Sequence, residues 1–430
     1  MSSFRQWFDR DKLKEIFRTH WESFKGTFSR YREDRYDEVV QKMLGCGDAK
    51  NGYAIYVCGK CGGERRKVPF SCKSCFCLSC AKVYTDRWAA RIEAILFPGV
   101  AYRHTVLTVP DDLRRYFYRE AKLLSELMRV GVECLADTLR TVLRRPVEGG
   151  YILVLQTNGR SGSYNPHLHI IMTSGGIVAN GRGGYSWVTL KYFPYEILHK
   201  KWQYHLFRML KERVPTREMQ AKIDELYRKY PQGLVANIQK GEVPKRIREL
   251  AKYLAKYVVS PPISVRRMVS YDGKRVQYWY PDHKSGRRKM EEVDVFQFIG
   301  RMVQHILPRG KQRVRYYGLY AAAVYRKIYR KLRAILPTDA AQCQETFTIG
   351  RKGYRQRVME TTAGRDPFIC SLCGGELMLW RIWHPSYGVI YDEEERLKSG
   401  QYERPQRRRD PDVGDLRYSL LQLSLPGLRV

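Results

Sequence analysis

The segment from residue 151 to residue 173 reads YILVLQTNGRSGSYNPHLHIIMT. Two apolar runs of β-type residues enclose the polar turn NGRSGS (residues 158–163), which predicts an antiparallel hairpin. Residues two apart on a strand face the same side of a sheet. His167 and His169 are therefore expected to project together, with Leu168 buried behind them.

The two imidazoles can bind one divalent cation. Gln156 is the candidate third ligand, because it lies on the facing strand of the hairpin and offers an amide oxygen. A cation held there would coordinate a phosphate oxygen and offset the charge that develops during phosphoryl transfer. A His-x-His pair on a strand is also common without a metal, so this motif needs support from elsewhere in the chain.

That support comes from a second motif, in which Tyr253, Lys256 and Tyr257 lie in a helical run that begins 84 residues after His169. Residues i and i+4 share a helix face, so both phenols can reach one site. A tyrosine that attacks a phosphodiester forms a covalent phosphotyrosine link. Because a phenol has a pKa near ~10, it needs activation by the metal or by Lys256. A Tyr-x3-Tyr pair alone more often reflects packing.

Charge indicates the substrate. The 430 residues include 78 Lys and Arg against 44 Asp and Glu, a formal net charge of +34. An excess of this size favours a polyanionic partner. The basic run Arg65-Arg66-Lys67 is expected to contact phosphates. Arginines interleaved with tyrosines can stack on unpaired bases as well as contact phosphates, and these candidates are Arg313, Arg315, Tyr316 and Tyr317.

Seven of the 11 cysteines fall between Cys46 and Cys80, which in a reducing compartment indicates metal binding rather than disulfides. Two Cys-x2-Cys pairs separated by 15 residues have the spacing of a tetrahedral zinc site, namely Cys58 with Cys61 and Cys77 with Cys80. The remaining candidates can hold a second zinc ion, so one or two ions are expected in residues 20–80; these candidates are Cys46, Cys72, Cys75 and His20. Cys370 and Cys373 lack a clear second pair, although His384 or Cys343 can complete one.

Periodicity and turn residues predict an α+β protein in three parts. These are a helical and zinc-binding region (1–97), a central domain (98–310) with an insertion at 174–231 and a basic β-meander at 263–293, and a basic C-terminal region (311–430) with a small Cys-x2-Cys module and a charged tail. Strands are expected at 102–109, 151–157, 167–173, 186–190 and 233–239. Helices are expected at 3–45, 82–96, 111–143, 294–306 and 318–335, with further helices before Tyr230 and one that begins at Pro244.

The ordered set Asn165-Pro166-His167-Leu168-His169, Tyr253-Leu254-Ala255-Lys256-Tyr257 and Pro261-Pro262 resembles the HUH endonuclease superfamily. More narrowly, the chain is similar to the two-tyrosine rolling-circle transposases of the insertion-sequence ninety-one family, over roughly residues 40–385. In that family the position of Cys75 is commonly basic.

This resemblance implies an HUH nuclease domain, in which helices flank a central antiparallel sheet. It implies that one tyrosine nicks single-stranded DNA at an element end and becomes 5′-linked, that the second serves another strand transfer, and that Mg²⁺ or Mn²⁺ assists. The implied partners are single-stranded DNA of the element ends and target. No Gly-x4-Gly-Lys-Ser/Thr loop for ATP is found, so host replication or helicase proteins are further candidate partners.

Two other functions fit the same residues. A plasmid or phage replication initiator, or a relaxase, would use the same chemistry. A zinc-containing DNA-binding regulator without catalysis would leave the histidine and tyrosine motifs unexplained. With no run of 18 apolar residues and a polar N-terminus, the chain is expected in the bacterial cytoplasm, associated with the nucleoid and not with a membrane.

Overall fold

A computed structural model describes residues 11–74, 76–97, 99–180, 184–238, 247–258, 263–264, 267–282, 285–335 and 366–399. The helices are α1 (Asp11–Thr27), α2 (Asp34–Leu44), α3 (Leu78–Ile95), α4 (Asp111–Arg119), α5 (Lys122–Leu143), α6 (Tyr195–Arg213), α7 (Arg217–Lys229), α8 (Ile247–Val258), α9 (Val295–Val303), α10 (Ala322–Ile335) and α13 (Glu393–Lys398), with 3-10 turns η1 (Ser29–Arg32) and η2 (Ala49–Asn51). The strands are β1 (Tyr53–Cys58), β2 (Arg65–Pro69), β3 (Tyr102–Thr108), β4 (Gly150–Asn158), β5 (Tyr164–Thr173), β6 (Gly175–Asn180), β7 (Gly184–Thr189), β8 (Ala236–Ile238), β9 (Met268–Tyr271), β10 (Arg275–Pro281), β11 (Arg288–Asp294), β12 (Val314–Gly318), β13 (Leu377–His384) and β14 (Gly388–Asp392). The predicted α+β class is confirmed.

The central sheet has the order β12-β4-β5-β3-β8, and every neighbouring pair is antiparallel. The predicted hairpin is its centre, with Gln156 paired to His167 across β4 and β5. On the other side of β5, Val106 of β3 pairs with His169. Strand β12 occupies one edge, a position that the Arg/Tyr composition of its segment did not reveal.

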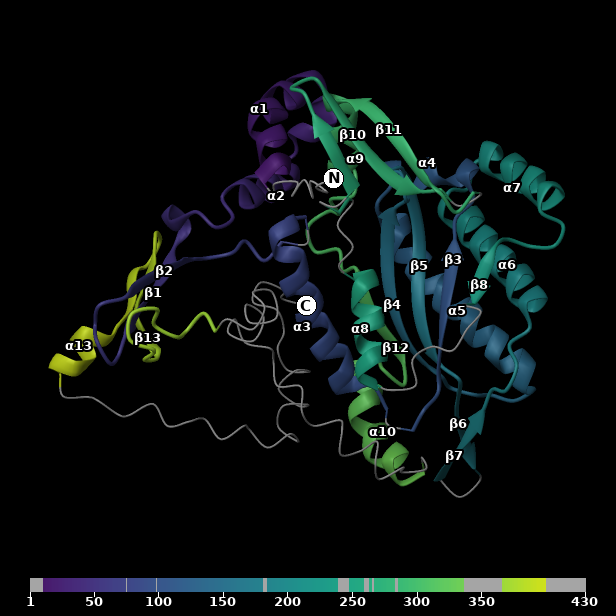
Figure 1. Ribbon diagram of the computed structural model, residues 1–430. Coiled ribbons are helices and arrows are strands. Elements are labelled where there is room, and N and C mark those ends of the chain that lie inside the picture. Colours follow the sequence, from purple (N-terminus) through teal and green to yellow (C-terminus); the bar gives the residue numbers. More distant parts are fainter. Residues whose placement is uncertain are drawn as a thin grey trace, which may run out of the picture.

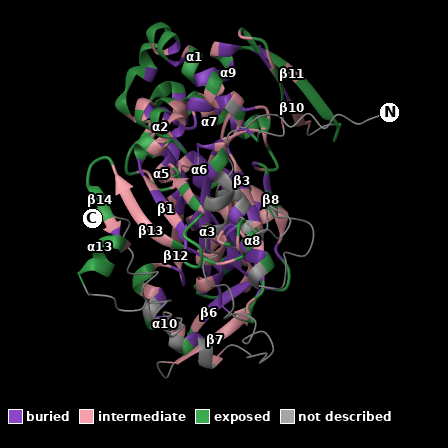
Figure 2. Ribbon diagram, turned by 60° about the vertical axis from the view of Figure 1, so that its left-hand side comes forward, coloured by how far each residue is buried: buried purple, intermediate pink, exposed green. Residues whose placement is uncertain are grey.

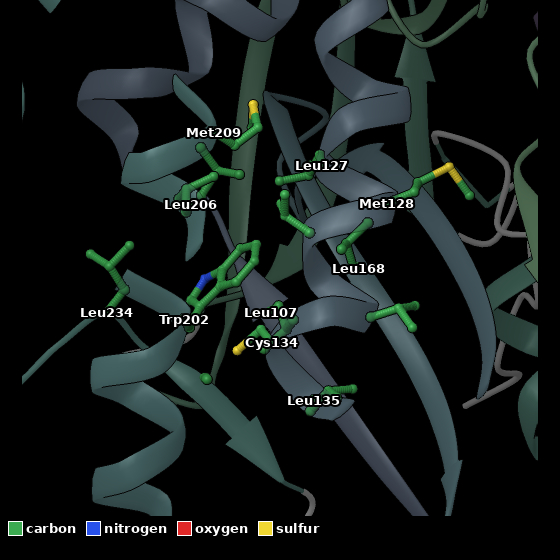
Figure 3. Packing of buried hydrophobic residues seen from close by; sticks show 14 of the residues in the cluster. Leu107, Leu127, Met128, Cys134, Leu135, Leu168, Trp202, Leu206, Met209 and Leu234 are labelled. Carbon is green, nitrogen blue, oxygen red and sulfur yellow. The ribbon is translucent and has the colours of Figure 1, made fainter. Parts of the chain in front are cut away.

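Helices cover both faces of this sheet (Figure 1). One face packs on α5 and α6, and its core includes Leu107, Leu153 and Leu168. Figure 3 shows Leu168 enclosed by side chains of α5 at the level of Leu127 and Met128. The opposite face packs against α3, α8 and α10 through a separate core. Because side chains alternate along a strand, residues next to Leu168 on β5 face this second layer.

A second body combines the N-terminal helices with the three-stranded meander β9-β10-β11. Aromatic residues of α1, including Phe17, Trp21 and Phe24, share a core with Phe298 of α9 and Tyr278 of β10. The predicted meander is confirmed, whereas the helix expected at 3–45 is divided by η1 into α1 and α2. Figure 2 shows exposed residues along β11 and α13, at the outer ends of the molecule.

A third sheet has the order β14-β13-β1-β2 and joins the two ends of the chain. Strands β1 and β2 lie in the cysteine-rich segment, where no strand was predicted, and β13 pairs with β1 from Tyr53↔Trp383 to Cys58↔Leu377. The predicted boundary at residue 311 is therefore wrong, because β12 belongs to the central sheet and β13 to the N-terminal zinc region. Within the charged tail, residues 393–398 form α13, and residues 400–430 lie outside the described part.

Among the described helices, none is long and apolar enough to cross a membrane.

Candidate active site and metal centres

Three adjacent strands of the central sheet present polar side chains on the face that α8 covers. Strand β5 contributes His167 and His169, β4 contributes Gln156, and β3 contributes His104. Sequence reasoning missed His104. The sequence offered only a histidine on the strand expected at 102–109, and the structure adds that Val106, two positions on, pairs with His169.

A continuous chain of hydrogen bonds links these strands to α8. Tyr253 Oη lies 2.7 Å from His104 Nδ1, and His104 Nε2 lies 3.0 Å from His169 Nδ1. His169 Nε2 in turn lies 3.1 Å from Gln156 Oε1. The phenol of Tyr253 is thereby connected to His169 through the imidazole of His104, and to Gln156 through His169.

The amide oxygen of Gln156 determines which atom donates in each of these hydrogen bonds. An amide oxygen only accepts, so His169 Nε2–H donates to Gln156 Oε1. A neutral His169 then accepts at Nδ1 from His104 Nε2–H, and His104 Nδ1 accepts from the Tyr253 hydroxyl. Neutral His169 agrees with its burial, which lowers its pKa well below the ordinary value. The Tyr253 hydroxyl therefore donates its hydrogen bond to His104 Nδ1.

His167 is oriented by the backbone beside it. Its Nδ1–H donates to the Asn165 carbonyl at 2.7 Å, which leaves Nε2 as an electron-pair donor. Burial also lowers the pKa of His167, so the ring stays neutral near pH 7. The rings of His167 and His169 lie 4.9 Å apart and nearly perpendicular. The side chains of the predicted donor set, His167, His169 and Gln156, thus lie on one face of the sheet.

Helix α8 carries the predicted tyrosine pair. Tyr253 is half-buried against the core of the α8 layer, and its hydroxyl reaches the site as expected. The backbone of Lys256 and Tyr257 continues the same helix, but their side chains lie outside the described residues. Helix α3 runs alongside α8 (Figure 1). The position of α8 is thus tied to the cysteine-rich region from which α3 starts.

The cysteines form two groups, and the predicted pairing of Cys58 and Cys61 with Cys77 and Cys80 is wrong. In each group the sulfur atoms all lie within 4.8 Å of one another. The first group consists of Cys46, Cys72, Cys77 and Cys80, and the second of Cys58, Cys61, Cys370 and Cys373. Strand β1 carries the first Cys-x2-Cys pair away from the second pair and toward β13, which explains the exchange of partners.

His20 is not a ligand in this arrangement, because its Nε2 lies 2.7 Å from the Tyr271 hydroxyl, outside both cysteine groups. Cys75 and Cys343 lie outside the described residues. Four thiolates already complete a tetrahedral zinc shell without them. His384, considered as a partner of Cys370 and Cys373, lies instead at the far end of β13, where its Nδ1 accepts from Ser386 N–H at 3.1 Å.

The basic run on β2 remains a candidate for phosphate contacts. Arg65 is exposed, and Lys67 is exposed above the ring of Tyr53 at 3.8 Å. Arg66 is partly buried and forms an ion pair with Glu64. Two of the three predicted cations are therefore available to a nucleic acid.

The Arg/Tyr segment lies on β12 and is less suited to the predicted role. Arg315 pairs with Leu153 and so points to the α5 face, away from the histidines, where it contacts Ser125. Arg313 follows the same alternation and donates to the His305 carbonyl at 2.9 Å. Tyr316 and Tyr317 pack into the cores on opposite faces of the sheet, so neither ring is placed to stack on a base.

Comparisons with known proteins agree on one kind of enzyme. Residues 150–327 match the family described as a putative transposase, and residues 16–109 match a transposase zinc-binding domain. The transposase for insertion sequence element IS801 of Pseudomonas savastanoi pv. phaseolicola is 28% identical over 358 residues, 79% of this chain and 82% of that protein. The putative transposase y4qJ of Sinorhizobium fredii is 25% identical over 388 residues, 84% of this chain and 92% of that protein. No solved structure matches the chain.

Proposed function

Because the chain belongs to the transposases of the insertion sequence IS91 family, with an N-terminal zinc-binding domain, we propose that it cuts and rejoins single-stranded DNA at element ends through a 5′-phosphotyrosine intermediate. The observation that carries the proposal is the hydrogen-bond chain from Tyr253 through His104 to His169 and Gln156. It links a phenol to two of the three proposed metal ligands on a protein of net charge +34.

In the proposed reaction the Tyr253 oxygen attacks the phosphorus of a phosphodiester. A P–O bond forms to tyrosine and the P–O3′ bond breaks, so the downstream strand stays attached through its 5′-phosphate. The phenol proton is balanced by the proton gained at the new 3′-hydroxyl. The covalent link conserves the bond energy, so attack by a 3′-hydroxyl rejoins DNA without another energy source.

The proposed metal ligands are His167, His169 and Gln156. A donor set of two imidazoles and one amide oxygen accepts Mg²⁺ and is more favourable for Mn²⁺, since imidazole is a less hard ligand than Mg²⁺ prefers. A bound ion would polarise the phosphate and offset its developing charge.

His104 is proposed to position the nucleophile. An imidazole that binds a cation through Nε2 keeps its proton on Nδ1. His169 would then donate to His104 Nε2, and His104 Nδ1–H would donate to the Tyr253 oxygen. A donated hydrogen bond stabilises the phenolate form of a tyrosine, which is the nucleophile. This arrangement links occupation of the metal site to activation of Tyr253.

The proposed substrates are the single-stranded ends of the element and its target. Tyr257 is proposed to serve the second strand transfer, since it follows Tyr253 by one helical turn. Exposed Arg65 and Lys67 are proposed phosphate contacts. Separation of duplex DNA would fall to host replication or helicase proteins.

The test is a covalent adduct assay. The purified protein is incubated with single-stranded oligonucleotides that carry the element ends, with Mn²⁺, and separated on denaturing gels. Tyr253→Phe should reduce adduct on the first cut by at least about 100-fold, and His167→Ala should do the same. Tyr192→Phe, at a residue 68% exposed, is the matched control and should cut normally.

Two results would count against the proposal. Adduct formed at the wild-type rate by Tyr253→Phe would show that Tyr253 is not the nucleophile of the first cut. No adduct with any element end would favour the regulator without catalysis. A replication initiator or relaxase would cut an origin sequence in preference to the element ends.

A further inference from the structure

The second cysteine group is built from two matching knuckles at opposite ends of the chain. Residues 58–63 read CGKCGG and residues 370–375 read CSLCGG, and Cys61 and Cys370 are 309 positions apart. In both, the glycine that directly follows the second cysteine has a left-handed backbone, with φ 64° at Gly62 and 70° at Gly374. Both glycine amides donate at 3.0 Å to the carbonyl of the first cysteine in their knuckle. Equivalent turns thus present two thiols each.

The sulfur positions fit one tetrahedral metal ion. Cys58 Sγ lies 3.5 Å from Cys373 Sγ, and Cys61 Sγ lies 3.8 Å from Cys370 Sγ. Zn–S bonds of ~2.3 Å set the edge of a tetrahedron at about 3.8 Å. A disulfide would require about 2.05 Å. The spacing therefore matches metal coordination and excludes paired disulfides.

The surroundings of the thiols are those of a zinc knuckle. Backbone amides point at the sulfur atoms, with Cys61 N–H donating to Cys58 Sγ at 3.5 Å and Gly63 N–H to Cys61 Sγ at 3.4 Å. A side chain on Gly375 would meet Cys58 Sγ at 3.2 Å and Cys373 Sγ at 3.3 Å. Glycine at this position therefore keeps the space next to the four sulfurs clear.

The local core is too small to hold this region together alone. Its buried members are Cys58, Cys370 and Leu377, with Tyr56 and Phe368 packed beside them. A cluster of this size needs a covalent or metal cross-link to stay folded. Besides the backbone pairing of β1 with β13, the polar contacts between the two segments include Glu64, which accepts from Ser371 N–H at 2.5 Å and from its hydroxyl at 3.0 Å.

We propose that Cys58, Cys61, Cys370 and Cys373 hold one structural Zn²⁺ that joins the two ends of the chain, separate from the ion of the first cysteine group. The module of residues 366–399 is then an integral part of the N-terminal zinc-binding region. The nuclease domain between them becomes a closed loop, which restricts the unfolded chain and so stabilises the fold. This inference does not depend on the strand-transfer chemistry.

Zinc content measured by mass spectrometry gives the first test. The full-length protein should contain two zinc ions per chain. Cys370→Ser with Cys373→Ser should contain one, as should Cys58→Ser with Cys61→Ser. The matched control Cys343→Ser should retain two. One zinc ion in the wild-type protein, or two in the Cys370/Cys373 double variant, would overturn the proposal.

A second test keeps all four cysteines and so does not depend on folding of the variants. A specific protease site is inserted after Gly350, and the cut protein is passed over a sizing column. The C-terminal fragment should elute with the N-terminal fragment while zinc is bound, separate after chelation, and reassociate when zinc is restored. Separation of the fragments with zinc still present would refute the link between the ends.

Discussion

Tyr253 Oη lies 2.7 Å from His104 Nδ1, while the other nitrogen of the same ring lies 3.0 Å from His169 Nδ1. His104 is 3% exposed, and its ring stacks on His169 with centroids 5.2 Å apart. A buried, stacked ring has little freedom to rotate, so both hydrogen bonds are held in place. The geometry makes the His104 side chain responsible for the relative position of the proposed nucleophile, Tyr253, and the proposed metal ligand, His169.

Replacement of His104 by Phe should therefore slow adduct formation by about 10- to 100-fold and raise the Mn²⁺ concentration needed for half-maximal cleavage. Phe preserves the stacking but removes both nitrogens. The adduct assay across a Mn²⁺ titration measures the two effects, and a dependence of rate on pH that differs from wild type is expected as well. His384→Gln, distant from the site, is the control. Wild-type rate and Mn²⁺ dependence in His104→Phe would contradict the positioning role.

On the opposite face of β5 from the two histidines, Leu168 packs closely against Gly131 of helix α5. Gly131 of α5 lies so close to β5 that a Cβ atom there would meet Leu168 Cδ1 at 2.4 Å. Leu168 is fully buried, so it cannot move aside without disturbing its neighbours. Because Leu168 stands between His167 and His169, its displacement would tilt both proposed metal ligands.

Gly131→Ala is expected to destabilise the fold by about 1–2 kcal/mol through overpacking. It should also raise the Mn²⁺ concentration needed for half-maximal cleavage roughly tenfold. Urea unfolding and the metal titration measure these changes. Gly26→Ala is the matched control, since nothing lies within 4 Å of its added Cβ and it sits in helix α1. That variant should be neutral or more stable by up to about 1 kcal/mol. Equal behaviour of the two variants would show that close packing at Leu168 is unimportant.

The hairpin, the meander and the shared face of His167 and His169 could be predicted because each depends on local alternation and turn residues. Register also made Gln156 a candidate from sequence alone. His104 was missed because its role depends on which strand pairs with β5 on its second edge, and β3 precedes β5 by more than 50 residues. Local patterns carry no information about such pairing.

The prediction of which cysteines share a zinc ion was wrong for a related reason. Four Cys-x2-Cys pairs and further single cysteines can be combined in several ways, and spacing along the chain favours near neighbours. The pairing of β1 with β13 brings Cys58 to Cys370 instead. Assignment of residues 311–430 as a separate region failed through the same long-range strand contacts.

The first cysteine group should influence catalysis through α3. Cys77 is the N-cap of α3 and Cys80 lies in its first turn, while the body of α3 packs along α8, the helix of Tyr253. Loss of this zinc removes the anchor of α3 and should destabilise the fold by on the order of 5 kcal/mol. We expect Cys77→Ser with Cys80→Ser to lower both the melting temperature and the adduct yield.

The Cys370→Ser and Cys373→Ser double variant provides the comparison, since its site lies on the third sheet and away from α8. It should lose one zinc ion yet keep most of its cleavage activity. If the Cys77/Cys80 variant remained folded, had lost its zinc and still cut DNA at the wild-type rate, α3 would not transmit the effect of that ion to α8.

His305 should make stability depend on pH. Its Nε2–H donates to the Gly162 carbonyl at 3.1 Å, and its Nδ1 lies 3.2 Å from the Thr157 hydroxyl, so it anchors the turn between β4 and β5. Complete burial lowers the pKa of His305 to about 3, whereas its ordinary value is 6.5. Between these values the unfolded chain binds a proton that the folded chain does not. The stabilising contribution is therefore present above pH 6.5 and is lost progressively as the pH falls toward 3.

Between pH 7 and pH 5 this linkage should reduce the free energy of unfolding by about 2 kcal/mol. Other groups titrate in the same range, so the measured quantity is the difference between wild type and His305→Gln, whose side chain does not titrate. Urea unfolding at pH 7, 6 and 5 should show that the advantage of wild type shrinks as the pH falls. An advantage that stayed constant across this range would mean that His305 titrates normally, and the turn that holds Gln156 near His167 would then have to be fixed by other contacts, such as the Gly162 carbonyl with Gln304.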